Sequence, residues 1–181
     1  LGGNYAGMLD LYSDFTQLQN ELKIHIEPLE MCDLHACMER ASQEDVWEKL
    51  AEIESFFQMP AADAADPIVA RPEREELAWA ARVACGEQAL VESRELSALT
   101  YYYHGAGGNL YERMGAGLIV GNSLLTAAGV PCAGEGDMKT AVAMKICDLL
   151  DAGGSFSEIV AADYNRDTII MGHDGPFHIR I

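Results

Sequence analysis

The sequence predicts an α/β fold, in which an open sheet with flanking helices spans residues 1–152. A β-rich C-terminal domain is expected over residues 153–181, truncated here. Three observations support this. Segments with helical spacing of apolar residues alternate with short apolar runs typical of strands. Residues 130–150 read as strand, loop and helix in succession, and the pattern after residue 153 changes to strand-like runs separated by turn residues.

The N-terminal third is predicted to contain helices and one short strand. Apolar residues spaced by three and four over residues 7–22 indicate an amphipathic helix. Residues 22–27 alternate apolar and polar side chains before Pro28, which predicts a strand that ends at the proline. Residues 29–58 carry apolar positions at helical intervals, and we expect that helical run to end before Pro60.

The middle of the chain is predicted to form an exposed connection, a long helix, a strand and a second helix. Residues 61–67 combine Ala, Asp and Pro, as exposed connections do. Residues 73–94 are rich in Glu, Ala and Leu, which are good helix formers. Residues 96–103 contain aromatic side chains suited to a strand, and residues 110–128 predict a helix that Gly129 stops.

The C-terminal third predicts one more strand and helix and then a pair of strands. Residues 130–133 are strand-like, and Asp137 is placed to cap a helix that runs to Leu150. Residues 156–161 and 168–171 read as strands joined by a polar turn. The strand–loop–helix unit is the kind of element that carries a ligand site at its loop.

Composition narrows the possible functions. The 181 residues include 12 Lys and Arg against 29 Asp and Glu, a net charge of −17 that disfavours nucleic acid and anionic membrane surfaces as partners. A hydrophobic content of 49% fits a folded protein, and no apolar stretch is long enough to cross a bilayer. The five cysteines are an odd number with no secretory leader before them, which predicts reduced thiols and a cytoplasmic location.

Both ends of the chain look like cuts. The first residue is Leu1 rather than Met, and the last residues, 178–181, read as the inside of a strand. We therefore expect this chain to be a segment of a longer polypeptide.

Glu135 is the most informative candidate for chemistry. It lies between Gly134 and Gly136 in the loop that follows a predicted strand, where open α/β sheets bind ligands. The flanking glycines would let a ligand or a metal ion approach the backbone closely. The alternative is an ordinary solvated glutamate in a turn.

Asp163 and His173 each follow a predicted strand of the C-terminal pair. Two carboxylates and one imidazole are an oxygen-rich donor set that suits Mn²⁺ or Mg²⁺ better than zinc. The alternative is that Asp163 caps a turn and that His173 packs beside Gly172. The hypothesis therefore depends on whether Glu135, Asp163 and His173 converge in space.

Two other motifs are weaker candidates. Cys32, His35 and Cys37 have zinc-ligand residue types, but they fall within a predicted helix and lack a fourth ligand at a usual spacing. Residues 101–103 are three consecutive tyrosines followed by His104, a combination that could line a sugar pocket. Because side chains alternate along a strand, only some of the tyrosines can face one pocket.

Four motifs in order along the chain carry a family resemblance. They are GMLDLYSDFT at 7–16, GNSLLT at 121–126, GEGDMKTA at 134–141 and MGHDGP at 171–176. Together they resemble the L-arabinose/L-fucose isomerase family. The resemblance implies that this segment is the central domain, with a Rossmann-like open sheet, and the start of the C-terminal domain. It also implies that an N-terminal domain is missing.

The resemblance implies roles for the three candidate residues. Glu135 matches the family's metal-binding glutamate, which also takes part in proton transfer, and His173 resembles a metal-site histidine. Asp163 looks like the second acidic ligand and acid/base of the fucose isomerase branch. In the arabinose branch a glutamate stands one place earlier, where this chain has Ala162, so the exact branch stays open. A further family histidine would lie beyond Ile181.

The implied function is aldose–ketose isomerisation through an enediol, with the two carboxylates as base and acid in either order. L-arabinose to L-ribulose is the first expectation, and L-fucose to L-fuculose is the second. The implied cofactor is Mn²⁺, or another divalent cation such as Mg²⁺ or Co²⁺, and the implied assembly is a homo-oligomer, a trimer or hexamer. We expect this segment alone to have little activity. The rival functions are a non-catalytic sugar-binding α/β domain and a metal-dependent aldolase or hydrolase.

Overall fold

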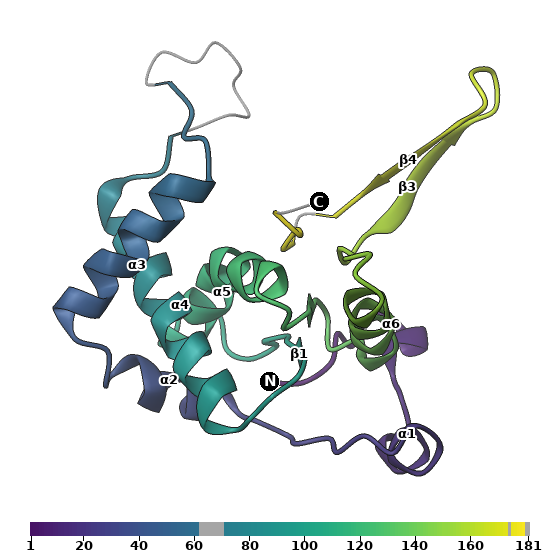
Figure 1. Ribbon diagram of the computed structural model, residues 1–181, viewed down its shortest axis with the longest axis horizontal. Helices are drawn as coiled ribbons and strands as arrows, with labels where there is room; N and C mark the ends of the chain where they lie inside the picture. The colour runs from purple at the N-terminus through teal and green to yellow at the C-terminus, as the bar shows by residue number, and fades with distance from the viewer. Residues whose placement is uncertain (62–70, 174, 180–181) are drawn as a thin grey trace.

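The structure is a computed structural model that describes residues 1–61, 71–173 and 175–179 (Figure 1). The helices of these residues are η1 (Leu9–Leu11), α1 (Phe15–Leu22), α2 (Met31–Met38), α3 (Gln43–Phe56), α4 (Arg74–Ser93), α5 (Leu110–Ala127) and α6 (Met138–Leu149). The strands are β1 (Leu99–Thr100), β2 (Cys132–Ala133), β3 (Glu158–Asp163) and β4 (Thr168–Gly172). The predicted mixed α/β fold is confirmed, with smaller sheets than expected. Within the described part of the chain, no helix is both long and apolar enough to cross a membrane.

Helix α4 is the centre of the helical part, packed against α2, α3 and α5 (Figure 1). It begins with a capping box in which the Glu73 and Glu76 side chains exchange bonds with each other's backbone N–H groups. The α2–α4–α5 core is apolar and almost completely buried; its most deeply buried members are Leu34, Met38, Val83, Leu90, Met114 and Leu118. Helix α5, which contributes Met114 and Leu118 to this core, connects strands β1 and β2.

Strands β1 and β2 form a parallel pair in which Leu99 lies opposite Cys132. Helix α5 is the crossover between them, as parallel pairing requires, and α6 packs on the same pair. The N-terminal ammonium group of Leu1 donates to the Thr100 carbonyl at 2.8 Å, and the Tyr102 N–H donates to the Leu1 carbonyl, so Leu1 lies along the other edge of β1.

Strands β3 and β4 form an antiparallel hairpin that extends away from the helices (Figure 1). Asp163 pairs with Thr168 at the turn end, and Glu158 pairs with Gly172 at the base. Beyond the hairpin, the chain returns to the helical part, where the Phe177 N–H donates to the Ser123 hydroxyl at 3.2 Å.

Some elements differ from the sequence prediction. The predicted strand at residues 22–27 is wrong: α1 ends at Leu22 and is capped by Lys23, whose φ of 58° is left-handed, and residues 23–30 have no regular secondary structure. The predicted helical run at 29–58 is two helices, because Ser42 forms a capping box that starts α3 anew.

Other differences concern lengths. Residues 96–103 contribute only the two-residue strand β1, and residues 7–22 begin with a 3₁₀ turn before α1. His178 and Ile179 are not in a strand. Most of the predicted connection at 61–67 lies outside the described residues.

Candidate active site

The carboxyl ends of β1 and β2 meet at one edge of their small sheet. Tyr101 continues β1 there, and Gly134 and Glu135 continue β2. The Tyr101 N–H donates to the Ala133 carbonyl at 3.2 Å, and the Gly136 N–H donates to the Tyr101 carbonyl at 3.1 Å. The predicted loop is therefore fixed where α/β proteins bind ligands.

The backbone of this loop is left-handed at two successive residues. Glu135 has φ of 59° and Gly136 has φ of 75°. Asp137 follows and caps α6, as predicted: its carboxylate accepts from the backbone N–H groups of Lys139 and Thr140 at 3.0 and 3.1 Å. The loop thus makes a sharp turn from the strand end into the helix.

His173 lies over the same loop. Its ring meets that of Phe156 edge to face, with 4.6 Å between the ring centroids. A Cβ atom at Gly134 would lie 2.9 Å from Phe156 Cε1 and 3.7 Å from His173 Cε1, so both rings pack against the glycine that precedes Glu135. The structure therefore places His173 over the loop that carries Glu135.

Asp163 lies elsewhere, at the turn end of the hairpin. Its carboxylate accepts from the N–H groups of Asn165 and Arg166 at 3.0 and 3.3 Å, and it lies 3.7 Å from the Arg166 guanidinium. This is the turn-capping arrangement that the sequence left open. Among the residues described, no three His, Cys, Asp or Glu side chains are grouped to hold a metal ion. The metal-binding roles of Glu135, Asp163 and His173 stay predictions.

Glu158 is a carboxylate that the sequence reasoning missed. It is exposed at the base of the hairpin, paired with Gly172, the residue before His173. It lies two residues from Phe156, whose ring touches both His173 and the loop. Counting back residue by residue from the turn places Glu158 opposite His173, and the irregularity between Ile159 and Ala161 shifts the pairing to Gly172.

Aromatic side chains flank the loop on one side. The Tyr102 ring lies 5.2 Å from that of Tyr5 and stacks on His104 at 6.2 Å. Partial burial, together with Tyr5 and Glu135 nearby, raises the pKa of the Tyr102 hydroxyl, which keeps it protonated. Tyr103 instead accepts a hydrogen bond from the Asn109 side-chain amide at 2.7 Å.

The cysteine motif does not form a site. Cys37 is buried, Cys32 is exposed, and His35 lies 3.6 Å from Glu39 on the same helix. All five cysteines, each among the described residues, are free.

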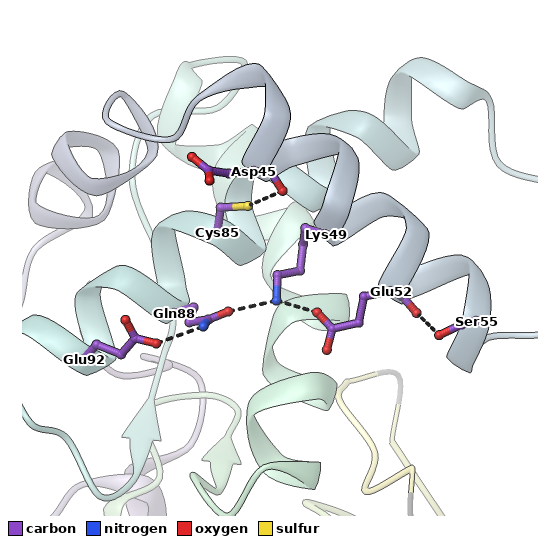
Figure 2. A network of polar contacts seen from close by, with 7 residues as sticks. All are labelled: Asp45, Lys49, Glu52, Ser55, Cys85, Gln88 and Glu92. Atoms are coloured by element: carbon purple, nitrogen blue, oxygen red, sulfur yellow. Dashed lines mark hydrogen bonds and ion pairs between the residues drawn. The ribbon is translucent and has the colours of Figure 1, made fainter.

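A second polar cluster lies on the helices, away from the strand ends. Figure 2 shows Lys49 of α3 donating to Glu52 at 2.6 Å and to Gln88 of α4 at 2.8 Å. Gln88 in turn donates to Glu92 at 2.8 Å. The bond between Lys49 and Gln88 crosses a groove between the two helices and links α3 to α4, whereas the other two bonds each lie within one helix.

The fold and the site define an α/β protein in which an imidazole lies over the loop that carries a glutamate, beside the carboxyl ends of two parallel strands. Comparison with known families gives a more specific result. Residues 12–153 match the L-arabinose isomerase central domain, and the chain belongs to this family of sugar isomerases. A search of curated proteins finds no match to the chain.

Proposed function

We propose that this chain is part of a metal-dependent aldose–ketose isomerase that converts L-arabinose to L-ribulose. The observation that carries the proposal is that His173 lies over the loop of Glu135, at the strand ends of a domain from this family. Asp163 matches the fucose branch only by its position in sequence, and its place at the hairpin turn gives no support to L-fucose as the substrate.

The donor types fit a divalent cation. Glu135 offers carboxylate oxygens and His173 offers an imidazole nitrogen, a mixture that suits Mn²⁺, with Mg²⁺ or Co²⁺ as alternatives. When bound, such an ion would stabilise negative charge on the sugar oxygens. The position of Glu158 at the hairpin base favours it over Asp163 as the second carboxylate.

The chemistry assigned to the carboxylates is proton transfer. One carboxylate takes the proton from C2 of the aldose while a C1–C2 double bond forms and the carbonyl oxygen gains a proton. C1 then receives a proton and the oxygen on C2 gives one up, which leaves the ketone. Phe156 fixes the His173 ring beside this reaction, and Tyr102, kept protonated, can donate a hydrogen bond to a sugar hydroxyl.

The test is the Glu135→Gln variant in the polypeptide that contains this chain, assayed with L-arabinose and L-fucose in Mn²⁺. We expect the rate of ketose formation to fall about 10²- to 10⁴-fold. Glu95→Gln is the matched control, since Glu95 is exposed and also has a left-handed backbone, with φ of 51°. If the unsubstituted polypeptide bound sugar without turnover, the result would instead support a sugar-binding domain. If it cleaved the sugar, the result would support an aldolase.

The assembly and location are part of the proposal. A cytoplasmic homo-oligomer, a trimer or hexamer, would give the exposed apolar side chains of the hairpin a surface to pack against; these are Ile159, Val160, Ile169, Ile170 and Met171. Light scattering on the purified protein measures the number of subunits.

A further inference from the structure

The N-terminal residues Gly3, Asn4 and Tyr5 form a strap across the Glu135 loop. The Tyr5 N–H donates to the Glu135 carbonyl at 2.9 Å. The Asn4 side-chain amide donates to the Gly136 carbonyl, also at 2.9 Å, across 132 residues of sequence. Two successive carbonyls of the loop are thus held by two successive residues of the strap.

The strap and the loop are in direct contact. A Cβ atom at Gly136 would lie 2.5 Å from the Gly3 carbonyl oxygen and 2.8 Å from Asn4 Cα. Real Cβ atoms do not approach other atoms so closely, and the φ of 75° at Gly136 also favours glycine. Only a glycine therefore fits at residue 136 against the strap.

The strap is itself anchored. Leu1 is bonded to the edge of β1 through Thr100 and Tyr102, and the Gly2 N–H donates to the Leu29 carbonyl at 2.8 Å. The hydrogen bonds from Asn4 and Tyr5 therefore tie the loop to the sheet, not to a loose chain end.

Glu135 needs such external support. A left-handed backbone is unfavourable for a residue with a side chain, and it persists where surrounding contacts impose it. The hydrogen bonds around this backbone are those from Asn4 and Tyr5, that from Gly136 to Tyr101, and that from the Asp137 N–H to the Gly134 carbonyl at 3.0 Å, which closes the turn. Of these four, only the bond from Asn4 is made by a side chain that substitution can remove.

We propose that Asn4 is a positioning residue for Glu135. Its amide fixes the Gly136 peptide and hence the direction in which the Glu135 side chain leaves the backbone. The catalytic part of this inference rests on the proposed function, whereas the structural part does not.

The structural part is tested by hydrogen exchange without metal or sugar. In the Asn4→Ala variant, the amide of Gly136 should exchange at least tenfold faster, with little change in α4. Asn20→Ala is the control, because Asn20 is exposed and its amide contacts only the neighbouring Glu21, at 3.3 Å. Equal exchange at Gly136 in the two variants overturns the proposal.

The functional part is tested by Mn²⁺ affinity, measured calorimetrically, and by kcat and KM in the polypeptide that contains this chain. Asn4→Ala and Asn4→Asp should weaken Mn²⁺ binding 10- to 100-fold and lower kcat, as loss of a group that orients a ligand does. The melting temperature of each variant, measured alongside, distinguishes a specific loss of Mn²⁺ binding and kcat from a loss caused by unfolding. If Glu135→Gln abolishes activity and Asn4→Ala alters neither the affinity for Mn²⁺ nor kcat, the proposal that Asn4 positions Glu135 is wrong. If Glu135→Gln has no effect, the proposed function is wrong.

Discussion

Glu87 is a fully buried carboxyl group between α4 and α5, with 0% of its surface exposed. Neither of its oxygens has a hydrogen-bond partner within the described part of the chain. One oxygen touches the position where Gly121 would carry a Cβ atom, so the group fits because α5 has a glycine there. Burial raises the pKa of Glu87 well above its ordinary value, and the carboxyl is held neutral.

Glu87 should make the protein less stable as pH rises. In the unfolded chain the group titrates near pH 4.5, and in the folded chain it titrates higher. The stability due to the neutral carboxyl is therefore complete below pH 4.5 and is lost as pH rises toward the folded pKa. The slope is at most about 1.4 kcal/mol per pH unit. Urea unfolding between pH 5 and 8 measures it.

The Glu87→Gln variant should lose this contribution to the slope, because a carboxamide does not titrate. Glu48→Gln on the exposed face of α3 removes a carboxyl that is not buried and should leave the slope unchanged. A variant at Glu87 whose stability follows pH as steeply as the natural chain would contradict the assignment of a neutral buried carboxyl.

At the scale of elements, α4 approaches α2 closely because it carries Gly86. A Cβ atom there would overlap the Met38 side chain and lie 3.1 Å from the Met38 backbone nitrogen. The side chain of Met38 could move, but the backbone of a packed helix cannot do so without cost. Gly86 therefore sets the distance between the two helices.

Gly86→Ala should destabilise the fold by about 1–3 kcal/mol, since overpacking outweighs the gain of about 1 kcal/mol in helix propensity. Gly115→Ala in α5 is the matched control, because a Cβ there would meet Tyr103 at an ordinary 3.4 Å. That variant should be neutral or more stable. Thermal unfolding of both variants measures these changes in stability. A Gly86→Ala variant that is more stable than the natural chain would show that Met38 moves aside at little cost.

The elements that the sequence predicted well are those set by local signals. The predicted helix at 73–94 is α4, Arg74–Ser93, because its composition and capping residues lie within the helix itself. The strand predicted at 22–27 failed because alternation does not supply a partner, and no strand pairs with that segment in the described residues.

The residues of the candidate site were also predicted with unequal success. Glu135 and His173 were predicted from their positions after strands, and the parallel pairing of β1 and β2 leaves Glu135 at the sheet edge. Asp163 also follows a strand, but in a hairpin successive strands run in opposite directions. Their ends therefore lie at opposite ends of the hairpin, which separates Asp163 from His173. The prediction used the spacing of Asp163 and His173 along the chain but not the opposite directions of the two strands.

At the scale of the whole molecule, the β3–β4 hairpin is the least protected part. Ile159 and Val160 are 64% and 63% exposed, and within the described residues no third strand pairs with either strand. An isolated two-stranded hairpin is marginally stable in water. The helices around α4, by contrast, share a buried apolar core.

Hydrogen exchange of this chain alone should therefore proceed in two classes. Amides of β3 and β4 should exchange within seconds, and those in the centre of α4 should exchange only by global unfolding. Mass spectrometry of peptides from the two regions measures both rates. Slow exchange in the hairpin of a monomeric chain would mean that its cross-strand contacts are sufficient by themselves.

The strap also constrains the order in which parts of the protein fold during synthesis. Asn4 leaves the ribosome long before Gly136, and at ordinary synthesis rates the 132 residues between them take roughly 7–26 s to make. During that interval Asn4 and Tyr5 have no loop to which they can donate hydrogen bonds. The turn that carries Glu135 can acquire its final shape only after both partners have emerged, so this corner of the molecule is among the last to become native.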